Sequence, residues 1–133
     1  MTDLVYPPII GSARAAFLML GLKFTVVGAQ NVPTTGGAVL ASNHVSYLDF
    51  IFVGLGADDS KRLVRFMAKD SVFKNKVSGP LMRGMHHIPV DRSAGADAYD
   101  NALDALRDGE VIGVFPEATI SRAFLIKDLK NGA

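Results

Sequence analysis

Short apolar runs and stretches with helical spacing alternate along most of the chain. Five apolar runs have the length of a buried strand and lie at residues 22–27, 37–41, 63–68, 88–90 and 111–115. Three stretches between them have the apolar spacing of a helix, at residues 46–55, 72–85 and 94–107. Strands that alternate with helices of this length are typical of βαβ units. The pattern therefore predicts an α/β fold with a mostly parallel or mixed sheet flanked by helices.

The N-terminal segment, residues 1–22, is rich in apolar residues and is considered separately. A proline pair near its start can begin a helix but cannot continue one, so we expect an apolar N-terminal helix over about residues 8–22. Arg14 near its middle makes a membrane-spanning helix a poor interpretation, and Asp3 does not fit the basic start of a secretory signal. Two interpretations remain open: the helix lies in a membrane interface, or it packs on the core of the domain.

The rest of the chain, residues 23–133, is short enough to be one α/β domain. With 49% hydrophobic residues it can form a core without cross-links. The sequence contains no cysteine, which excludes disulfides, thiolate nucleophiles and cysteine-based metal sites. His86 and His87 lack the further ligands that a zinc site needs, so no metal site is predicted. We treat the two histidines as residues at the entry of a strand, with His87 near the functional site.

Charge is distributed unevenly, although the formal net charge is only +1. Residues 61–92 contain eight basic and two acidic side chains, whereas residues 93–110 contain one basic and five acidic side chains. The near-neutral total argues against a nucleic-acid-binding protein. The basic segment is either a solvated face, as charge runs usually are, or a surface for anionic substrates or lipid headgroups.

A histidine and an aspartate follow the predicted strand at residues 37–41, and functional sites in parallel sheets lie beyond the carboxyl ends of strands. Ser46 and Asp49 have the spacing of a capping box, with Ser46 as the N-cap. His44 then lies in the loop, and the chain can fold back so that the Asp49 carboxylate accepts a proton from one imidazole nitrogen. The other nitrogen is then free to act as a base toward a hydroxyl. The alternative is that Asp49 only caps the helix and His44 is an ordinary loop histidine.

Three motifs occur in order along the chain, at residues 43–49, 84–92 and 114–119. The first matches the pattern NHxSxxD, the second has a glycine before an apolar strand that ends in arginine, and the third is similar to FPEGT. Together they resemble the motifs of the glycerolipid acyltransferases, the family of glycerol-3-phosphate and 1-acylglycerol-3-phosphate acyltransferases. Three motifs in the family's order make this a specific resemblance.

The resemblance implies transfer of a fatty acyl group to a hydroxyl of a phosphorylated glycerol lipid of the lysophosphatidate type. Acyl-CoA or acyl-carrier protein would be the co-substrate, with no cofactor and no metal ion. His44 would be the general base, Asp49 would hold its tautomer, and Asn43 and Ser46 would contribute to substrate binding. We expect backbone N–H groups near Ser46 to stabilise the oxyanion.

The resemblance assigns four further residues to the binding of the acceptor: Arg92, Glu117, Thr119 and Arg122. Arg92 would hold a phosphate bidentately, the alternative being an ion pair with a neighbouring acid. The third motif departs from the family pattern, because Ala118 stands where glycine is common and Ile120 where arginine is common. Arg122 would then supply the missing cation, or the acceptor differs.

The family's members usually extend well beyond the third motif, so we expect that the C-terminal part of the family fold is missing from these 133 residues. An incomplete sheet would leave an apolar edge that favours self-association. An acceptor in a bilayer must be reached from its surface. We therefore expect peripheral association with phospholipid at the cytoplasmic face of the cell membrane. The alternative is a non-catalytic module that binds lipid or acyl-CoA.

Overall fold

Four parallel strands form the sheet of the computed structural model, which describes residues 3–91, 93, 95–118, 120–123 and 125–129. The strands are β1 (Ala38–Ala41), β2 (Val64–Lys69), β3 (Ile88–Val90) and β4 (Val111–Val114). Their order in the sheet is β1-β4-β2-β3, so the last strand lies between the first two. All four residues of β4 are buried, as expected for an internal strand of a parallel sheet. The predicted α/β class is confirmed.

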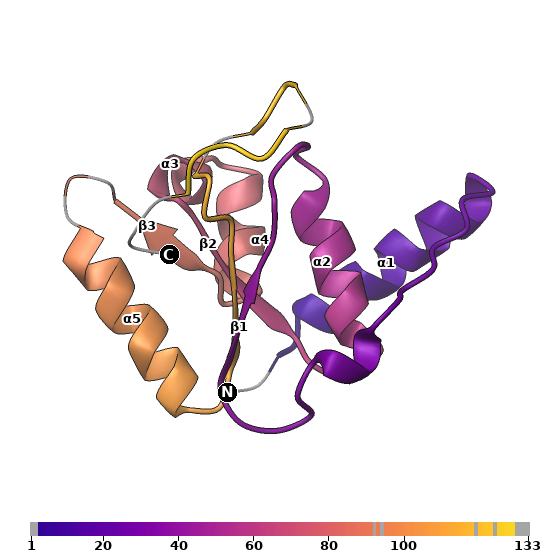
Figure 1. Cartoon of the computed structure of the whole chain (residues 1–133), viewed down its shortest axis with the longest axis horizontal. Coiled ribbons are helices and arrows are strands. Elements are labelled where there is room, and N and C mark those ends of the chain that lie inside the picture. Colours follow the sequence, from indigo (N-terminus) through magenta and orange to yellow (C-terminus); the bar gives the residue numbers. More distant parts are fainter. Residues whose placement is uncertain (1–2, 92, 94, 119, 124, 130–133) are drawn as a thin grey trace.

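Helices cover both faces of this sheet (Figure 1). In the described residues they are α1 (Tyr6–Met19), the 3-10 helix Ala29–Asn31, α2 (Asp49–Asp58), α3 (Asp70–Lys74), α4 (Ser78–Gly84) and α5 (Gly95–Arg107). Helix α5 packs on one face, against β3 and β4. Helix α2 packs on β2 from the other face, and α1 packs on α2. Helices α3 and α4 connect β2 to β3.

The face of the sheet opposite α5 carries an aromatic ring that is important for the site. Phe66 of β2 is buried with Val64, Val111 and Ala57. Gly113 of β4 is the register partner of Phe66, and a Cβ atom at this glycine would lie 2.5 Å from the Phe66 ring. The glycine therefore leaves the space that the ring occupies.

The segment 22–27 does not form the predicted strand and has no partner in the sheet. The ring of Phe24 instead stacks with those of Phe17 in α1 and Phe52 in α2, at centroid distances of 6.3 and 5.8 Å. Val27 at the end of the segment is 93% exposed. The prediction was wrong because strand propensity cannot distinguish pairing with a sheet from packing between two helices.

The predicted helix at residues 72–85 is divided into α3 and α4. Between them the side chain of Asn75 accepts hydrogen bonds from the backbone N–H groups of Val77 and Ser78, at 2.9 and 3.2 Å. Such local side-chain acceptors compete with helical hydrogen bonding and favour a turn. The apolar spacing continues across this turn, which is why it predicted a single helix.

Helix α1 begins and ends earlier than predicted and packs on the domain through its first half. Tyr6 and Ile10 are buried against Leu55 of α2 and Met85. Toward the end of the helix the side chain of Met19 is 89% exposed. The first half of α1 is therefore part of the fold, whereas its role at a membrane stays a prediction. Among the described residues, no helix is long and apolar enough to cross a bilayer.

A buried arginine joins the N-terminal segment to the sheet. Arg65 of β2 is 3% exposed. Its guanidinium donates to the carboxylates of Asp3 (2.9 Å) and Glu110 (3.2 Å) and to the backbone carbonyl of Met85 (3.1 Å). It also lies over the ring of Tyr6, 5.6 Å from the centroid. The start of α1 is therefore held by a charged hydrogen-bond network as well as by apolar packing.

Candidate active site

His44 and Asp49 are in direct contact at the start of α2. The Nδ1 atom of His44 lies 2.9 Å from Oδ2 of Asp49. The same oxygen accepts the backbone N–H groups of Val45 (2.7 Å) and Ser46 (2.9 Å). The prediction of Ser46 as the N-cap was wrong, because helix α2 begins at Asp49, its N-cap is Leu48, and no side chain caps it. The Oγ atom of Ser46 instead accepts the N–H of Leu48 at 3.1 Å, in the turn before the helix. The chain folds back at Ser46 as the sequence predicts.

This arrangement fixes the tautomer of the imidazole. Burial alone would raise the pKa of Asp49, but hydrogen bonds from Ser46, His44 and Val45 outweigh it and hold the pKa below its usual value. The carboxylate is therefore ionised near neutral pH and can only accept hydrogen bonds. The proton of a neutral His44 then lies on Nδ1, and Nε2 is a free base.

The register of β1 and β4 brings the first and third motifs together. Ala41 is paired with Val114, and three residues beyond each of them lie His44 and Glu117. An oxygen of Glu117 accepts the backbone N–H of His44 at 2.9 Å. The carbonyl of His44 in turn accepts the backbone N–H of Ser121 at 2.6 Å. The backbone on both sides of the candidate base is therefore held by Glu117 of the third motif and by Ser121, two residues after that motif.

Glu117 is 2% exposed and uses both carboxylate oxygens for backbone hydrogen bonds. The second oxygen accepts the N–H of Lys127 at 2.7 Å. The hydrogen bonds from Lys127 and His44 lower the pKa of Glu117. In this structure the side chain positions the His44 loop, and its predicted role in binding the acceptor stays a prediction.

The other predicted binding residues differ in how far the structure describes them. Asn43 is exposed directly before His44, and Arg122 is exposed one residue after Ser121. Arg92 and Thr119 lie outside the described residues. No cluster of three or more His, Asp or Glu side chains suited to a metal ion is present among the residues described.

The backbone N–H groups near Ser46, which the sequence suggested as donors to the oxyanion, already donate to other acceptors. The N–H groups of Val45 and Ser46 donate to Asp49, and the N–H of Leu48 donates to Ser46. These three groups stabilise the Asp49 carboxylate and the turn, so they are not available to a developing oxyanion. The sequence did not reveal this competition, because it depends on which way the Asp49 side chain turns.

Aromatic rings connect the His44 loop to the interior. His44 stacks on Phe115 at a centroid distance of 4.2 Å, Phe115 stacks on Phe66 at 5.9 Å, and the edge of Phe66 meets His87 at 5.5 Å. Phe50, directly after Asp49, also packs on Phe66 at 6.2 Å. The sequence did not predict this row of rings, because its members come from separate elements.

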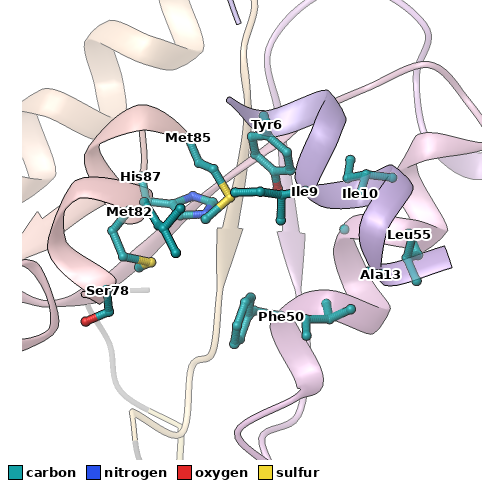
Figure 2. A pocket seen from close by; sticks show the side chains of 13 residues that line it. Tyr6, Ile9, Ile10, Ala13, Phe50, Leu55, Ser78, Met82, Met85 and His87 are labelled. Atoms are coloured by element: carbon teal, nitrogen blue, oxygen red, sulfur yellow. The ribbon is translucent and has the colours of Figure 1, made fainter. Parts of the chain in front are cut away.

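An apolar pocket of about 290 Å³ opens beside this row (Figure 2). Side chains of α1, α2 and α4 line it, together with Met85 and His87. Its lining includes Phe50 and Ile51, the two residues that follow the candidate catalytic Asp49 in the sequence. The lining is nearly all apolar, which suits a hydrocarbon chain. Apolar spacing indicated these helices, but it could not show that their packing leaves a cavity.

The residue after Glu117 has a strained backbone. Ala118 has a φ of 59°, in the left-handed region that favours glycine, and its N–H closes a turn on the carbonyl of Phe115 at 2.9 Å. This is the position at which the sequence departs from the glycine of the resembling motif. The departure therefore has a conformational cost.

We expect Ala118→Gly to stabilise the protein by about 0.5–1 kcal/mol, because relief of the left-handed strain exceeds the entropic cost of glycine. Denaturant unfolding of the two proteins measures the difference. Ala15→Gly, at an exposed position of helix α1, is the matched control and should be destabilising by about 1 kcal/mol. A loss of stability in the Ala118 variant would contradict the account of strain.

Fold and site together define an α/β domain with a histidine that contacts a carboxylate and with an apolar pocket whose lining includes Phe50, the residue after that carboxylate. A family model described as Acyltransferase matches residues 23–133, and the chain belongs to this family. No solved structure matches the chain.

Three curated proteins illustrate the relationship. The chain is 32% identical over 124 residues to the 1-acyl-sn-glycerol-3-phosphate acyltransferase of Bacillus subtilis, covering 91% of this chain and 60% of that protein. It is 27% identical over 124 residues to the protein of the same name from Borreliella burgdorferi (90% and 48%). It is 32% identical over 121 residues to the lyso-ornithine lipid O-acyltransferase of Rhizobium meliloti (89% and 39%). The chain therefore spans between about two fifths and three fifths of the length of these relatives.

Proposed function

We propose that this chain carries the reaction centre of a 1-acylglycerol-3-phosphate O-acyltransferase. It would move a fatty acyl group from acyl-CoA or acyl-carrier protein to the free hydroxyl of a lysophosphatidate-type glycerolipid. The observation that carries the proposal is the contact between His44 Nδ1 and Asp49 Oδ2, which leaves Nε2 as a base. The names of the two phosphate-acceptor relatives support the choice of acceptor.

The reaction needs one base and one acid, and a single imidazole can supply both. Nε2 of His44 removes the proton of the acceptor hydroxyl while that oxygen attacks the thioester carbonyl carbon. Collapse of the tetrahedral intermediate breaks the C–S bond, and the thiol leaves with the proton that the imidazolium returns. Asp49 stabilises the imidazolium between these two steps. The apolar pocket beside Phe50 would hold the hydrocarbon part of the acyl donor.

Turnover with defined substrates tests the proposal. The chain would be incubated with radiolabelled acyl-CoA or with a radiolabelled acyl group on acyl-carrier protein. The acceptors would be lysophosphatidate, glycerol 3-phosphate and lyso-ornithine lipid. We expect transfer to lysophosphatidate to exceed transfer to the other acceptors. The absence of transfer to any of the three acceptors would contradict the proposal and favour the non-catalytic binding module.

A different acceptor is the second candidate. The similarity to a lyso-ornithine lipid O-acyltransferase supports it, and so does the altered third motif, in which Ile120 stands at a position where arginine is common. In that case the base and the pocket keep their roles, and only the preferred acceptor in the turnover assay changes.

Peripheral membrane association belongs to the same proposal. Leu18, Met19 and Leu20 at the end of α1 are 78%, 89% and 71% exposed, so they form an apolar tip. Exposed basic residues of α3 and its flanks, Lys69, Lys74 and Lys76, would add attraction to anionic headgroups. Binding at the cytoplasmic face of the membrane would bring the pocket to its lipid substrates.

Replacing the three residues of the apolar tip by serine should remove most of the flotation of the protein with anionic vesicles, because little apolar surface would then enter the interface. Tyr99→Ser is the control, since Tyr99 is 56% exposed on α5, across the sheet from α1. Equal flotation of the tip variant and the unaltered protein would contradict the proposed contact.

A further inference from the structure

Among the described residues, one polar group that lines the apolar pocket has a donor without a hydrogen-bond partner. Three polar side chains line the pocket: Tyr6, Ser78 and His87. The hydroxyl of Tyr6 donates to the carbonyl of Val64 at 2.7 Å, and that of Ser78 donates to the carbonyl of Val72 at 2.8 Å. Both hydroxyl protons are therefore used outside the pocket.

His87 differs from the other two, because its backbone contact uses the ring as an acceptor. The backbone N–H of Phe66 donates to Nδ1 of His87 at 3.0 Å. Burial, with a smaller contribution from the charge of Arg65, lowers the pKa of His87 to about 4, so the ring is neutral near pH 7. A neutral imidazole that accepts at Nδ1 carries its proton on Nε2. In the part of the chain described, this Nε2–H has no acceptor.

The ring is placed so that its donor meets a pocket occupant. His87 is 6% exposed and points into the pocket beside Met82 and Met85 (Figure 2). The edges of Tyr6 and Phe66 pack on it at 5.4 and 5.5 Å and hold its orientation. Among the described residues, the buried side-chain polar atom without a partner is Oγ of Ser121, so the Nε2–H of His87 is accessible from the pocket. An apolar occupant would remove this donor from water, whereas an occupant with an acceptor atom would give it a new partner.

The group that meets His87 is not the reacting thioester. The rings of Phe115 and Phe66 lie between His44 and His87 in the aromatic row. An acyl donor with its carbonyl at His44 would therefore reach His87 with a part of its chain beyond the carbonyl. This step rests on the proposed function, since it takes the pocket as the site of the acyl chain.

We propose that the pocket selects acyl chains that carry a hydrogen-bond-accepting oxygen, such as a hydroxyl or keto group, and that Nε2–H of His87 binds this oxygen. The apolar walls bind the hydrocarbon on either side. His87 is thus a specificity-determining residue for the acyl donor.

Displacement of a bound fluorescent fatty acid from the whole chain measures the selectivity without any turnover. The competitors are hexadecanoic acid and its derivatives with one hydroxyl or keto group at successive chain positions. We expect at least one derivative to bind roughly three- to tenfold more tightly than hexadecanoic acid, as one additional neutral hydrogen bond predicts. Derivatives whose oxygen lies at a chain position away from His87 should bind more weakly than hexadecanoic acid, because their oxygen is buried without a hydrogen-bond donor.

His87→Asn is the informative variant. Its amide oxygen can still accept the N–H of Phe66, but the side chain no longer reaches the position of Nε2. The preference should disappear while the affinity for hexadecanoic acid stays within about twofold. Ser78→Ala is the control, because the hydroxyl that it removes already donates its proton to the carbonyl of Val72. This variant should retain the preference for the oxygen-bearing derivative. A thermal unfolding curve of each variant shows that it is folded.

The outcomes separate this inference from the proposed function. Equal binding of all derivatives and hexadecanoic acid, or a preference that survives in His87→Asn, would overturn the inference and leave the acyl pocket in place. Failure of hexadecanoic acid and every derivative to displace the probe would overturn the acyl pocket itself. A preference that depends on His87 would support the inference even if no acceptor in the turnover assay were acylated.

Discussion

Replacing His44 by alanine is expected to lower kcat for acyl transfer by roughly 10²- to 10⁴-fold, the range that a positioned general base contributes. The side chain is only partly buried and its backbone is held independently by Glu117 and Ser121. The fold should therefore be retained, and KM should change little. Steady-state kinetics with acyl-CoA and lysophosphatidate measures both parameters.

A second histidine provides the matched control for this experiment. Nδ1 of His86 lies 3.1 Å from Oδ1 of Asp3, a histidine–aspartate contact like that of the site but outside the pocket beside Phe50. His86→Ala should keep kcat within about threefold, since this residue has no part in the proposed proton transfer. A variant of His44 that is as active as His86→Ala would contradict the assignment of the base.

Replacing Arg65 by methionine is expected to lower the free energy of unfolding by roughly 3 kcal/mol, because it leaves two carboxylates and a carbonyl without their shared donor. The side chain of Arg65 is only 4% exposed, but those of Asp3 and Glu110 are 19% and 28% exposed, so water can solvate them in part. This places the loss at the low end of the range for a broken buried ion pair. Denaturant unfolding at neutral pH measures it.

Another ion pair of the N-terminal helix serves as the control. Arg14 binds Asp58 and Asp59 at 2.9 and 3.2 Å, but its side chain is 41% exposed. Arg14→Ala should therefore cost about 1 kcal/mol or less. Similar losses in the Arg14 and Arg65 variants would show that the buried network contributes no more than a surface pair.

The contribution of Asp3 to stability should also depend on pH. Burial would raise the pKa of Asp3, but the hydrogen bonds and charges of Arg65 and His86 outweigh this effect and lower it. A carboxylate with a depressed pKa in the folded state stabilises the protein above its unfolded pKa of about 4. This stabilisation is lost as the pH falls through the folded value. The difference between wild type and Arg65→Met should therefore become smaller from pH 6 to pH 3.

The sequence predicted the fold class because the alternation of strand-length and helix-length segments survives in the structure. Its errors have physical causes in particular contacts. The apolar residues at 22–27 pack between two helices, and Asn75 interrupts a helix without disturbing its apolar spacing. Neither contact changes the periodicity of apolar residues along the sequence, because both depend on which group a side chain contacts in the fold.

The contact between His44 and Asp49 was predictable because the two residues are close in sequence. They are five residues apart, and a bond from the N–H of Ser46 to the Asp49 carboxylate, which the capping-box spacing suggested, folds the chain back although Ser46 is not the N-cap. The backbone contact of Glu117 could not be predicted in this way, because it depends on β4 pairing with β1. The pocket and the donor of His87 require the packing of three helices, which no local pattern encodes.

The pairing of Ala41 with Val114 also fixes loop lengths. Because His44 and Glu117 stand at equal offsets from that pair, deleting one residue from either loop would move one partner by a full chain step of about 3.8 Å and break their contact. The number of residues between β1 and His44, and between β4 and Glu117, is therefore constrained as strongly as the identity of these residues. A homologue that keeps the contact and shortens one of these loops would have to shorten the other by the same number of residues.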